Sequence, residues 1–408
     1  MTPVAINEDV LRARVQAVLV AQGLSERGHS GCSMETRDLA RDIQRPARLE
    51  QIAKRERFIR SNTALARRYC ADGRHLDPAR IQPQLRVVSA GSEEEILFRW
   101  WNLCWWSIPY QPSYGRQMRY LVWDKGHDCV MGLLCLQSPV LRMAARDQYL
   151  GIQQSDVDYW VNQSMSASRV GAIPPYNDLI GGKLVAMAAT SNEVRREYTS
   201  KYGSRLTVME QRLIPPRLLF ITTTSAFGRS SIYNRLKIGG ESVAVRIGAT
   251  QGAGSFQVPD WLYHELLEYL DAQGVDVGRG YGHGPSRKMH LIATALGRLG
   301  LPASHYHGIR RELFLMPLAE NLSDIISGKS LPRWVDRPFD ELSEYWKTRW
   351  CLPRSTRCPG WHTFDAATLF DEQVPALLFE AKSLSQNAEQ YIGGEHGSSC
   401  IERGSGSA

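Results

Sequence analysis

Residues 169–240 constrain the fold most, because strand-like and helix-like patterns alternate there along a short stretch of chain. Residues 169–173 form an apolar run that stops at Pro174-Pro175, and proline does not continue the interior of a strand. Residues 218–224 are apolar or β-branched throughout, which is typical of a buried central strand. A helix is expected between the two strands, and residues 227–236 are expected to turn back into a second, short helix. This order predicts a mixed α/β core.

The turn after the first strand is the first candidate binding site. Residues 177–183, Asn-Asp-Leu-Ile-Gly-Gly-Lys, open a helix whose apolar side chains recur every three to four residues. Backbone N–H groups at a glycine-containing helix start bind phosphate oxygens, and the helix dipole favours the negative charge. A cofactor with a diphosphate is therefore a physical option at this turn.

Tyr233, in the second short helix, is the candidate proton donor. A free tyrosine has a pKa of about 10, so its neutral phenol can protonate a thiolate without special tuning. The alternative is a packed helix tyrosine with its hydroxyl at the surface. Asp147 is retained with Tyr233 as the catalytic pair. Glu210, Asp178 and His283 remain alternatives as general base, since no spacing selects one of them.

The length of 408 residues exceeds what one ordinary core needs, so several modules are expected. Residues 1–84 predict a basic helical module, and residues 85–258 contain the α/β core. Residues 259–373 predict a helical or mixed extension. Residues 374–408 drift towards Ser, Gly, Gln and Glu and are expected to form a disordered tail.

The start of the chain lacks a basic segment, and the apolar stretch of residues 15–24 is too short and too polar to span a bilayer. The 8 cysteines are spread over the whole length and define no disulfide framework. Both features predict a cytoplasmic protein without a membrane partner.

The net charge of +7 favours an anionic partner, either nucleic acid or a phosphorylated cofactor. Arg229, Arg235 and Arg246 flank the second half of the core and are candidates to clamp phosphate from a cofactor or a DNA strand. Arg287 and Lys288 stand near a helix start, where the dipole disfavours cations. These residues are the predicted nucleic-acid contacts.

Aromatic residues gather in two places. Residues 100–106 hold four tryptophans, which predict an aromatic core or wall, with stacking on bases as the alternative. Residues 345–350, followed by Arg354, interleave basic and aromatic side chains as nucleic-acid surfaces do, although an ordinary amphipathic helix has the same pattern. Residues 120–136 predict a β-hairpin.

No metal site is predicted. Cys351, Cys358 and His362 could ligate zinc, but they lack the two-residue spacing of structural zinc sites. A Walker loop, a Gly-x-Ser-x-Gly elbow and a His-Glu-x-x-His motif are also missing from the sequence.

Several motifs in order resemble the A protein family of the Druantia anti-phage defence system, over roughly residues 85–350. The motifs are Arg-Tyr-Leu-Val at 119–122, Arg146-Asp147 with Gly151, Pro-Pro-Tyr-Asn-Asp-Leu-Ile-Gly-Gly-Lys-Leu at 174–184, Gly-Arg-Ser-Ser-Ile-Tyr-Asn at 228–234, and Tyr-Trp-Lys-Thr-Arg-Trp at 345–350. This resemblance implies a role in bacterial defence against phage, with further defence subunits such as a helicase as partners.

The order of elements is also similar to that of the GNAT acyltransferases, and residues 228–234 are similar to the GNAT-like Mom protein of phage Mu. That resemblance implies coenzyme A or another acyl donor as cofactor. It places the diphosphate on Asn177, Gly181, Gly182 and Lys183, and it makes Tyr233 the general acid.

Together these observations predict an α/β (α+β) protein with a GNAT-like mixed sheet, flanking helices, a basic N-terminal helical module and a C-terminal helical extension. The predicted function is that of an anti-phage defence component whose core modifies or recognises nucleic acid, with DNA as the expected form. Two alternatives remain: a non-catalytic DNA-binding or scaffold subunit that works with a helicase, and a DNA transaction protein associated with mobile elements.

Overall fold

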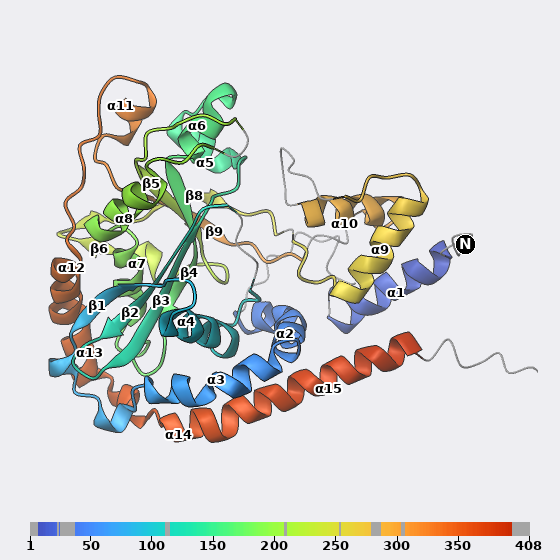
Figure 1. Cartoon of the computed structure of the whole chain (residues 1–408), viewed down its shortest axis with the longest axis horizontal. Helices are drawn as coiled ribbons and strands as arrows, with labels where there is room; N and C mark the ends of the chain where they lie inside the picture. Colours follow the sequence, from blue (N-terminus) through green and yellow to red (C-terminus); the bar gives the residue numbers. More distant parts are fainter. Residues whose placement is uncertain are drawn as a thin grey trace, which may run out of the picture.

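The computed structural model describes residues 7–22, 24, 37–110, 115–207, 210–252, 254–278, 287–302 and 307–393, excluding the side chains of 39 and 385–393. Its centre is a mixed sheet in the order β1-β2-β3-β4-β5-β9-β8, with helices on both faces (Figure 1). The strands are β1 Pro83–Val87, β2 Gln117–Asp124, β3 Cys129–Gln137, β4 Ser164–Ala172, β5 Phe220–Thr224, β8 Val245–Ala249 and β9 Glu312–Pro317, and a separate hairpin joins β6 Lys237–Ile238 to β7 Glu241–Ser242.

The helices cover both faces and extend beyond the sheet. The α-helices are α1 Glu8–Ala21, α2 Arg37–Ala53, α3 Glu56–Arg68, α4 Glu93–Cys104, α5 Ala144–Leu150, α6 Val157–Val161, α7 Gly181–Ala188, α8 Asn192–Tyr202, α9 Asp260–Ala272, α10 Arg287–Arg298, α11 Leu322–Ile326, α12 Phe339–Trp346, α13 Leu352–Arg357, α14 Ala366–Thr368 and α15 Val374–Gly393. The shorter turns are η1 Gly73–His75, η2 Pro78–Arg80, η3 Gln154–Asp156, η4 Tyr233–Arg235 and η6 Pro359–Thr363, with π-helical turns at η5 Lys347–Cys351 and η7 Leu369–Gln373. None of the helices in the described ranges is long and apolar enough to cross a membrane.

The predicted hairpin is confirmed as the antiparallel pair β2 and β3. Alternate residues of β2 enter different hydrophobic clusters, Tyr120 and Val122 on one face and Leu121 and Trp123 on the other. The strand is therefore buried on both faces, which explains its nearly continuous apolar sequence. The mixed α/β fold class and the flanking helices are confirmed, and the GNAT-like character of the sheet stays a prediction.

The two faces have separate cores. On one face α7, α8 and α12 pack through residues such as Leu184, Val194 and Trp346, all fully buried. The other face is covered by α2, α3, α4 and α15. There Trp100 and Trp101 are 0% exposed, so the aromatic-core interpretation is confirmed for these two residues.

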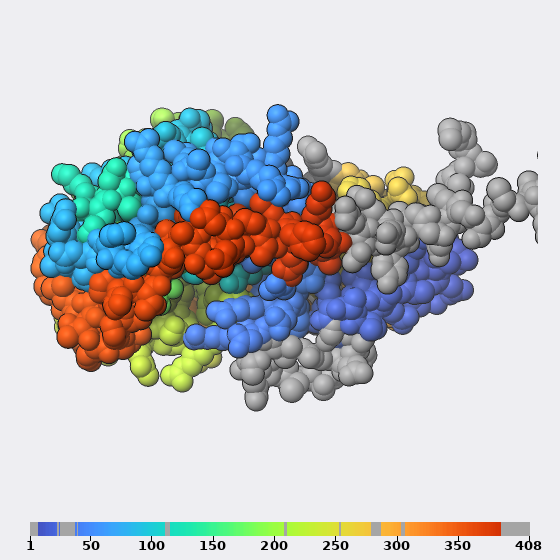
Figure 2. Space-filling view, turned by 90° about the horizontal axis from the view of Figure 1, so that it is seen from below, coloured from blue at the N-terminus to red at the C-terminus, as the bar shows by residue number. Residues whose placement is uncertain are grey.

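The expected disordered tail is wrong for its first half. Residues 374–393 form α15. Figure 2 shows its first part, up to residue 384, in orange-red beside the blue N-terminal helices. Val374, Leu378 and Ala381 are buried against the second core, and their spacing places them on one helix face. The polar composition of residues 374–408 does not reveal these three apolar positions. Residues 394–408 lie outside the described residues.

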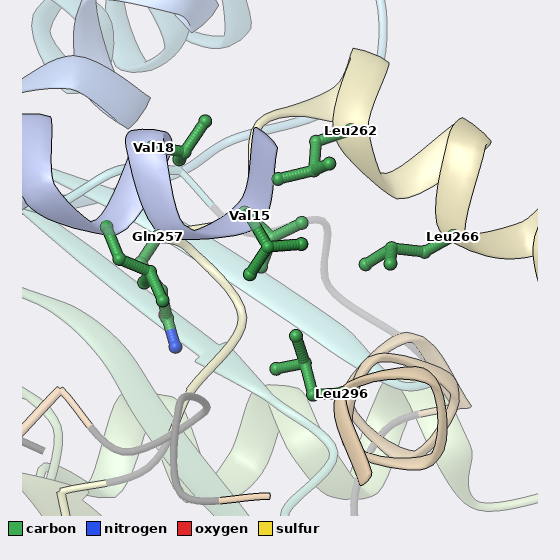
Figure 3. A pocket seen from close by; sticks show the side chains of 8 residues that line it. Val15, Val18, Gln257, Leu262, Leu266 and Leu296 are labelled. Atoms are coloured by element: carbon green, nitrogen blue, oxygen red, sulfur yellow. The ribbon is translucent and has the colours of Figure 1, made fainter. Parts of the chain in front are cut away.

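The helix α2 contributes to two cores. Its residues Ala40 and Ile43 pack with α1, α9 and α10, whereas Leu49 and Ile52 belong to the core under α4. Figure 3 shows side chains of α1, α9 and α10 converging on a small apolar gap. The N-terminal segment thus joins two parts of the fold, and the domain boundaries drawn from the sequence stay predictions.

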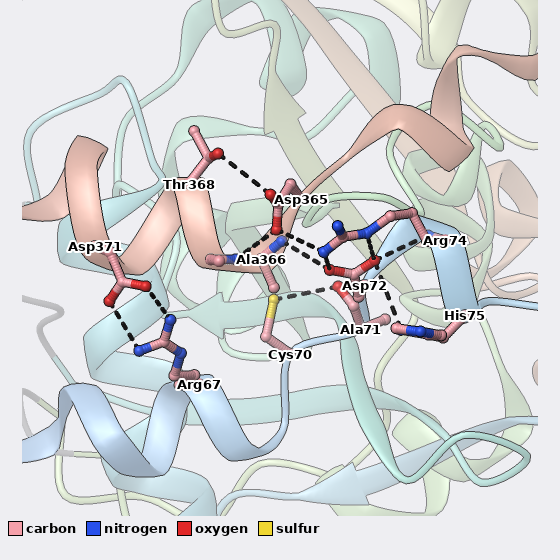
Figure 4. A network of polar contacts seen from close by, with 11 residues as sticks. Arg67, Cys70, Ala71, Asp72, Arg74, His75, Asp365, Ala366, Thr368 and Asp371 are labelled. Carbon is pink, nitrogen blue, oxygen red and sulfur yellow. Dashed lines mark hydrogen bonds and ion pairs between the residues drawn. The ribbon is translucent and has the colours of Figure 1, made fainter.

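A polar network ties the end of α3 to the C-terminal segment (Figure 4). Asp72 accepts hydrogen bonds from the backbone N–H and the guanidinium of Arg74 and, at 3.2 Å, from the Ala366 N–H. Arg74 also donates to Asp365 at 2.9 Å. Hydrogen bonds from Arg74 hold the pKa of the Asp72 carboxyl well below its ordinary value, against the opposing effect of burial.

We expect Asp72→Asn to lower the free energy of unfolding at pH 7 by about 1 kcal/mol, because charged acceptors for Arg74 and Ala366 are lost. The folded pKa of Asp72 is depressed, so this stabilisation is present above the unfolded value of about 3.9 and is lost as the pH falls through the folded value. Denaturant unfolding at a series of pH values measures both effects.

The control is Asp38→Asn, which removes an exposed carboxylate paired with Arg41 one turn away. It is expected to change stability by no more than a few tenths of a kcal/mol, about what an exposed helix pair contributes. Equal effects of the two substitutions, or a difference that grows in acid, would contradict the assignment.

Candidate functional site

The candidate site is built around a fork in the sheet. β4 and β5 pair in parallel from Ser164 and Phe220 to Ala167 and Thr223, whereas the other neighbours in this sheet pair antiparallel. Beyond this point β4 keeps β3 as its neighbour, while β5 ends one residue later. We call the point after Ala167 and Thr223 the fork.

Tyr233 lies at the fork. Its hydroxyl is 3.4 Å from Thr223 Oγ1, which itself donates to the Ala167 carbonyl at 3.0 Å. The ring packs on Phe314 with centroids 5.1 Å apart, and the residue is 6% exposed. Burial raises the pKa of Tyr233 to about 12. The phenol is therefore neutral at physiological pH and carries a proton at the fork.

The segment that carries Tyr233 is not the helix expected over residues 227–236. Only η4 is helical there, as a single 3-10 turn. Ser230 Oγ accepts the N–H groups of Ile232 and Tyr233 and so fixes the start of this turn.

Glu312, at the start of β9, holds this segment and was missed by the sequence reasoning. Its carboxylate accepts the Ser230 N–H at 2.8 Å and the Asn234 amide at 2.7 Å, and it forms an ion pair with Arg246 at 3.3 Å. A carboxylate at the head of an otherwise apolar strand was the available signal. The partners lie 66 to 82 residues away along the chain, so no local pattern reveals them.

The turn of residues 177–183 lies beside the same segment but is closed on itself. The N–H groups of Asn177, Ile180, Gly181 and Lys183 donate to backbone carbonyls of residues 173–180. A Cβ on Gly182 would lie 3.2 Å from Ile232, so the turn packs directly against the Tyr233 segment. An anion at these amides would have to replace the bonds within the turn. Diphosphate binding here stays a prediction.

Residues on both sides of the π-helical turn η5 contact the turn of residues 177–183. Trp346 Nε1 donates to the Ile180 carbonyl at 3.1 Å, and Arg354 Nε donates to the Asp178 carbonyl at 3.2 Å. π-helical turns are rare and often mark functional positions. The basic and aromatic residues singled out at 345–350 thus lie next to the predicted phosphate turn, which no sequence spacing indicates.

Like charges gather there. Lys183 Nζ donates to the Arg235 carbonyl at 2.9 Å and lies 4.4 Å from the Trp350 ring centroid. Burial lowers the pKa of Lys183, and the positive charges of Arg349 and Arg235 add to the effect. Within the described ranges none of these three cations forms an ion pair with a carboxylate. We call Lys183, Arg235 and Arg349 the basic patch.

The remaining predicted site residues lie elsewhere or are engaged. Asp147 forms an ion pair with the fully buried Arg146 at 2.6 Å and accepts the Met143 N–H. Arg229 is exposed beside η4. Arg287 and Lys288 pair with Asp276 and Asp260 in the α9 and α10 region, at 3.3 and 3.1 Å.

The other candidates for a base or a metal ligand give no further site. Glu210 and Asp178 are exposed, and His283 lies outside the described residues. Cys351 is buried, which raises its pKa to about 12. In the described part of the chain no group of three or more His, Cys, Asp or Glu residues is arranged to hold a metal ion.

The fold and site define a mixed α/β protein with a buried phenol at a sheet fork and a cationic surface beside it. The family model described as Druantia protein DruA matches residues 34–328. The Druantia protein DruA of Escherichia coli (strain UMEA 4076-1) is 35% identical over 373 residues, which cover 90% of this chain and 92% of the relative. No solved structure matches the chain. The chain belongs to the Druantia protein DruA family.

We expect Glu312→Gln to loosen the segment of residues 228–234. The two hydrogen bonds to Oε2 lose the negative charge that strengthens them, and an NH2 group replaces the oxygen that faces Arg246. Amide exchange at Ser230 should accelerate by about tenfold or more, consistent with losing a charge-assisted hydrogen bond. Hydrogen exchange by mass spectrometry checks this. Arg246→Gln is the control, since it removes only a partner that is 58% exposed, and exchange equal to wild type in both variants would contradict the role of Glu312.

Proposed function

We propose that this Druantia-family chain acts in bacterial defence against phage through a GNAT-like core that modifies or recognises nucleic acid. The single observation that carries the proposal is the fork with Tyr233 at its vertex. The order β4, turn, α7, β5, η4 is the order on which the GNAT resemblance rests. The proximity of Tyr233 to both β4 and β5 supports a role for its proton.

The residues around the fork fit an acyl donor that carries phosphates. Such a donor would supply an acyl group and leave as a thiolate. Lys183 and Arg235, with Asn177, Gly181 and Gly182 in the turn, would hold its phosphates after the turn opens. Tyr233 would hold a proton at its hydroxyl and transfer it to the departing sulfur, which needs a neutral phenol. Asp147 could act as a base only by giving up Arg146, with which it is paired.

The second candidate is a non-catalytic subunit that binds DNA or serves as a scaffold for a helicase partner. The closed turn favours it, because amides that donate within the turn do not bind phosphate. In that case the basic patch and Trp350 would contact a nucleic-acid backbone and bases, as interleaved basic and aromatic side chains do elsewhere. In both forms of the proposal, the protein lies in the cytoplasm and acts together with further defence subunits.

Neutralising Arg229, Arg235 and Arg246 together is expected to abolish phage protection, because both forms of the proposal need cations near η4. The measurement is plaquing efficiency on cells that carry the complete defence locus, with protein levels verified. The matched control replaces three arginines on other surfaces by glutamine, namely Arg60, Arg196 and Arg333. Protection that survives the first triple substitution would rule out nucleic-acid recognition at this surface.

Tyr233→Phe separates the two forms. If the core modifies nucleic acid, loss of the proton donor should slow transfer by about a hundredfold or more, and protection should fall while the protein remains folded. The scaffold form predicts unchanged protection. Circular dichroism and thermal unfolding verify the fold, because the lost hydroxyl has Thr223 as its partner.

Acetyl-coenzyme A should bind the purified chain in calorimetry, and Lys183→Met should weaken binding by about tenfold or more through loss of a charged contact. Lys201→Met is the control, since this lysine is exposed on α8 and donates to the Gln117 carbonyl. Absence of binding heat at millimolar ligand would remove the acyl-donor form and leave the scaffold form.

A further inference from the structure

A buried arginine lies just past the fork, on the face opposite to Tyr233. Arg169 of β4 is 7% exposed. Its guanidinium donates to the Asn102 side chain at 2.6 Å and to the carbonyls of Ser168 and Pro109 at 2.9 and 3.0 Å. All of these acceptors are neutral. Burial lowers the pKa of Arg169 to about 10, and the nearby Arg311 adds to the effect.

Two further arginines approach from α2 and from the residue before β9. Arg311 donates to the Gln44 side chain at 3.1 Å, and Arg48 donates to the Cys104 carbonyl at 2.6 Å. Gln44 and Arg48 are four residues apart on α2 and therefore share one helix face. The Nε atoms of Arg48 and Arg311 are buried without a hydrogen-bond partner, and burial lowers the pKa of both guanidinium groups.

The strand register places Arg169 and Arg311 at the same level of the sheet. Arg169 comes two residues after Ala167, the last residue of β4 that pairs with β5. Arg311 directly precedes Glu312, whose backbone exchanges hydrogen bonds with Ser225 just beyond the end of β5. The two arginines therefore lie near each other where β4 and β5 part, and the charge of Arg311 contributes to lowering the pKa of Arg169.

Among the described residues none of Arg48, Arg169 and Arg311 forms an ion pair with a carboxylate. The buried Arg146, by contrast, is matched by Asp147. Burying charged guanidinium groups among neutral acceptors costs free energy, and here two Nε donors also lack a hydrogen-bond partner. A bound anion would offset this cost by supplying the missing charge and acceptors. The guanidinium fork matches phosphate geometry, and several positive charges suit a doubly charged phosphate better than a carboxylate.

We propose that Arg48 and Arg311, supported by the charge of Arg169, bind one phosphate group of a nucleotide that enters the fork from the side of α2 and α4. Because these guanidinium atoms are buried, the phosphate would come from a free nucleotide or from the end of a single strand, and the backbone of an intact duplex does not reach them. The role of this site in phage defence rests on the proposed nucleic-acid function. Phosphate binding itself can be measured without it.

The test uses the full chain and measures thermal unfolding and calorimetry with inorganic phosphate, adenosine 5′-monophosphate, and a thymidine octanucleotide with or without a 5′-phosphate. At least one phosphate monoester should bind and raise the unfolding temperature, as ligands of the native state do. Arg311→Met and Arg48→Met should each weaken that binding by about tenfold or more. Arg60→Met, which removes an exposed arginine paired with Glu56 on α3, should leave it unchanged.

The arms of the test distinguish the two sources of phosphate. Preference for the monophosphate indicates a free nucleotide, and a requirement for the 5′-phosphate on the octanucleotide indicates a strand end; both support the site. Should the methionine variants not fold, Arg311→Lys and Arg48→Lys keep the charge, lose the Nε donor and should still weaken binding. The inference is overturned if no phosphate compound binds wild type, or if the variants bind as wild type does. If phosphate binding fails, the Tyr233→Phe and acetyl-coenzyme A experiments still test the proposed function independently.

Discussion

The parallel pairing of β4 with β5 is the constraint on which the core depends. Parallel neighbours cannot be joined by a tight turn, so the chain must cross over one face of the sheet, and here the crossover carries α7 and α8. That crossover supplies one of the two main cores. Because the pairing ends at Ala167 and Thr223, the sheet parts, and Tyr233 and Arg169 reach the fork from opposite faces.

Charge is arranged differently at three places around this fork. At η4 the positive charge is balanced, because Glu312 forms an ion pair with Arg246 and also accepts hydrogen bonds from two uncharged donors. At the turn of α7 and in the arginine group under α2, cations stand beside cations or neutral oxygens. An overall charge of +7 is a mild excess, and only its concentration at these two places makes anion binding a specific hypothesis.

Local sequence was enough wherever a segment's own pattern decided its structure. The β2 and β3 hairpin, β5 and the burial of Trp100 and Trp101 all follow from apolar runs that have few alternatives. Prediction from local sequence failed where the burial of a residue depends on a partner far away in the chain. The few apolar residues of α15 are buried only because this helix packs on the second core. Residues 227–236 form a short turn because Glu312 holds Ser230 and Asn234.

By itself, then, the sequence determined the class of fold, the order of strand, turn, helix and strand around residues 169–224, and the family motifs, because periodicity and turn chemistry act over a few residues. Tertiary structure alone decided where the strands part, that Tyr233 is buried at the parting, and which cations lack a carboxylate. These depend on strand register and on contacts between residues far apart in the chain, such as Arg169 with Asn102 and Lys183 with Trp350. No local pattern encodes such contacts, since they form only when separate elements pack together.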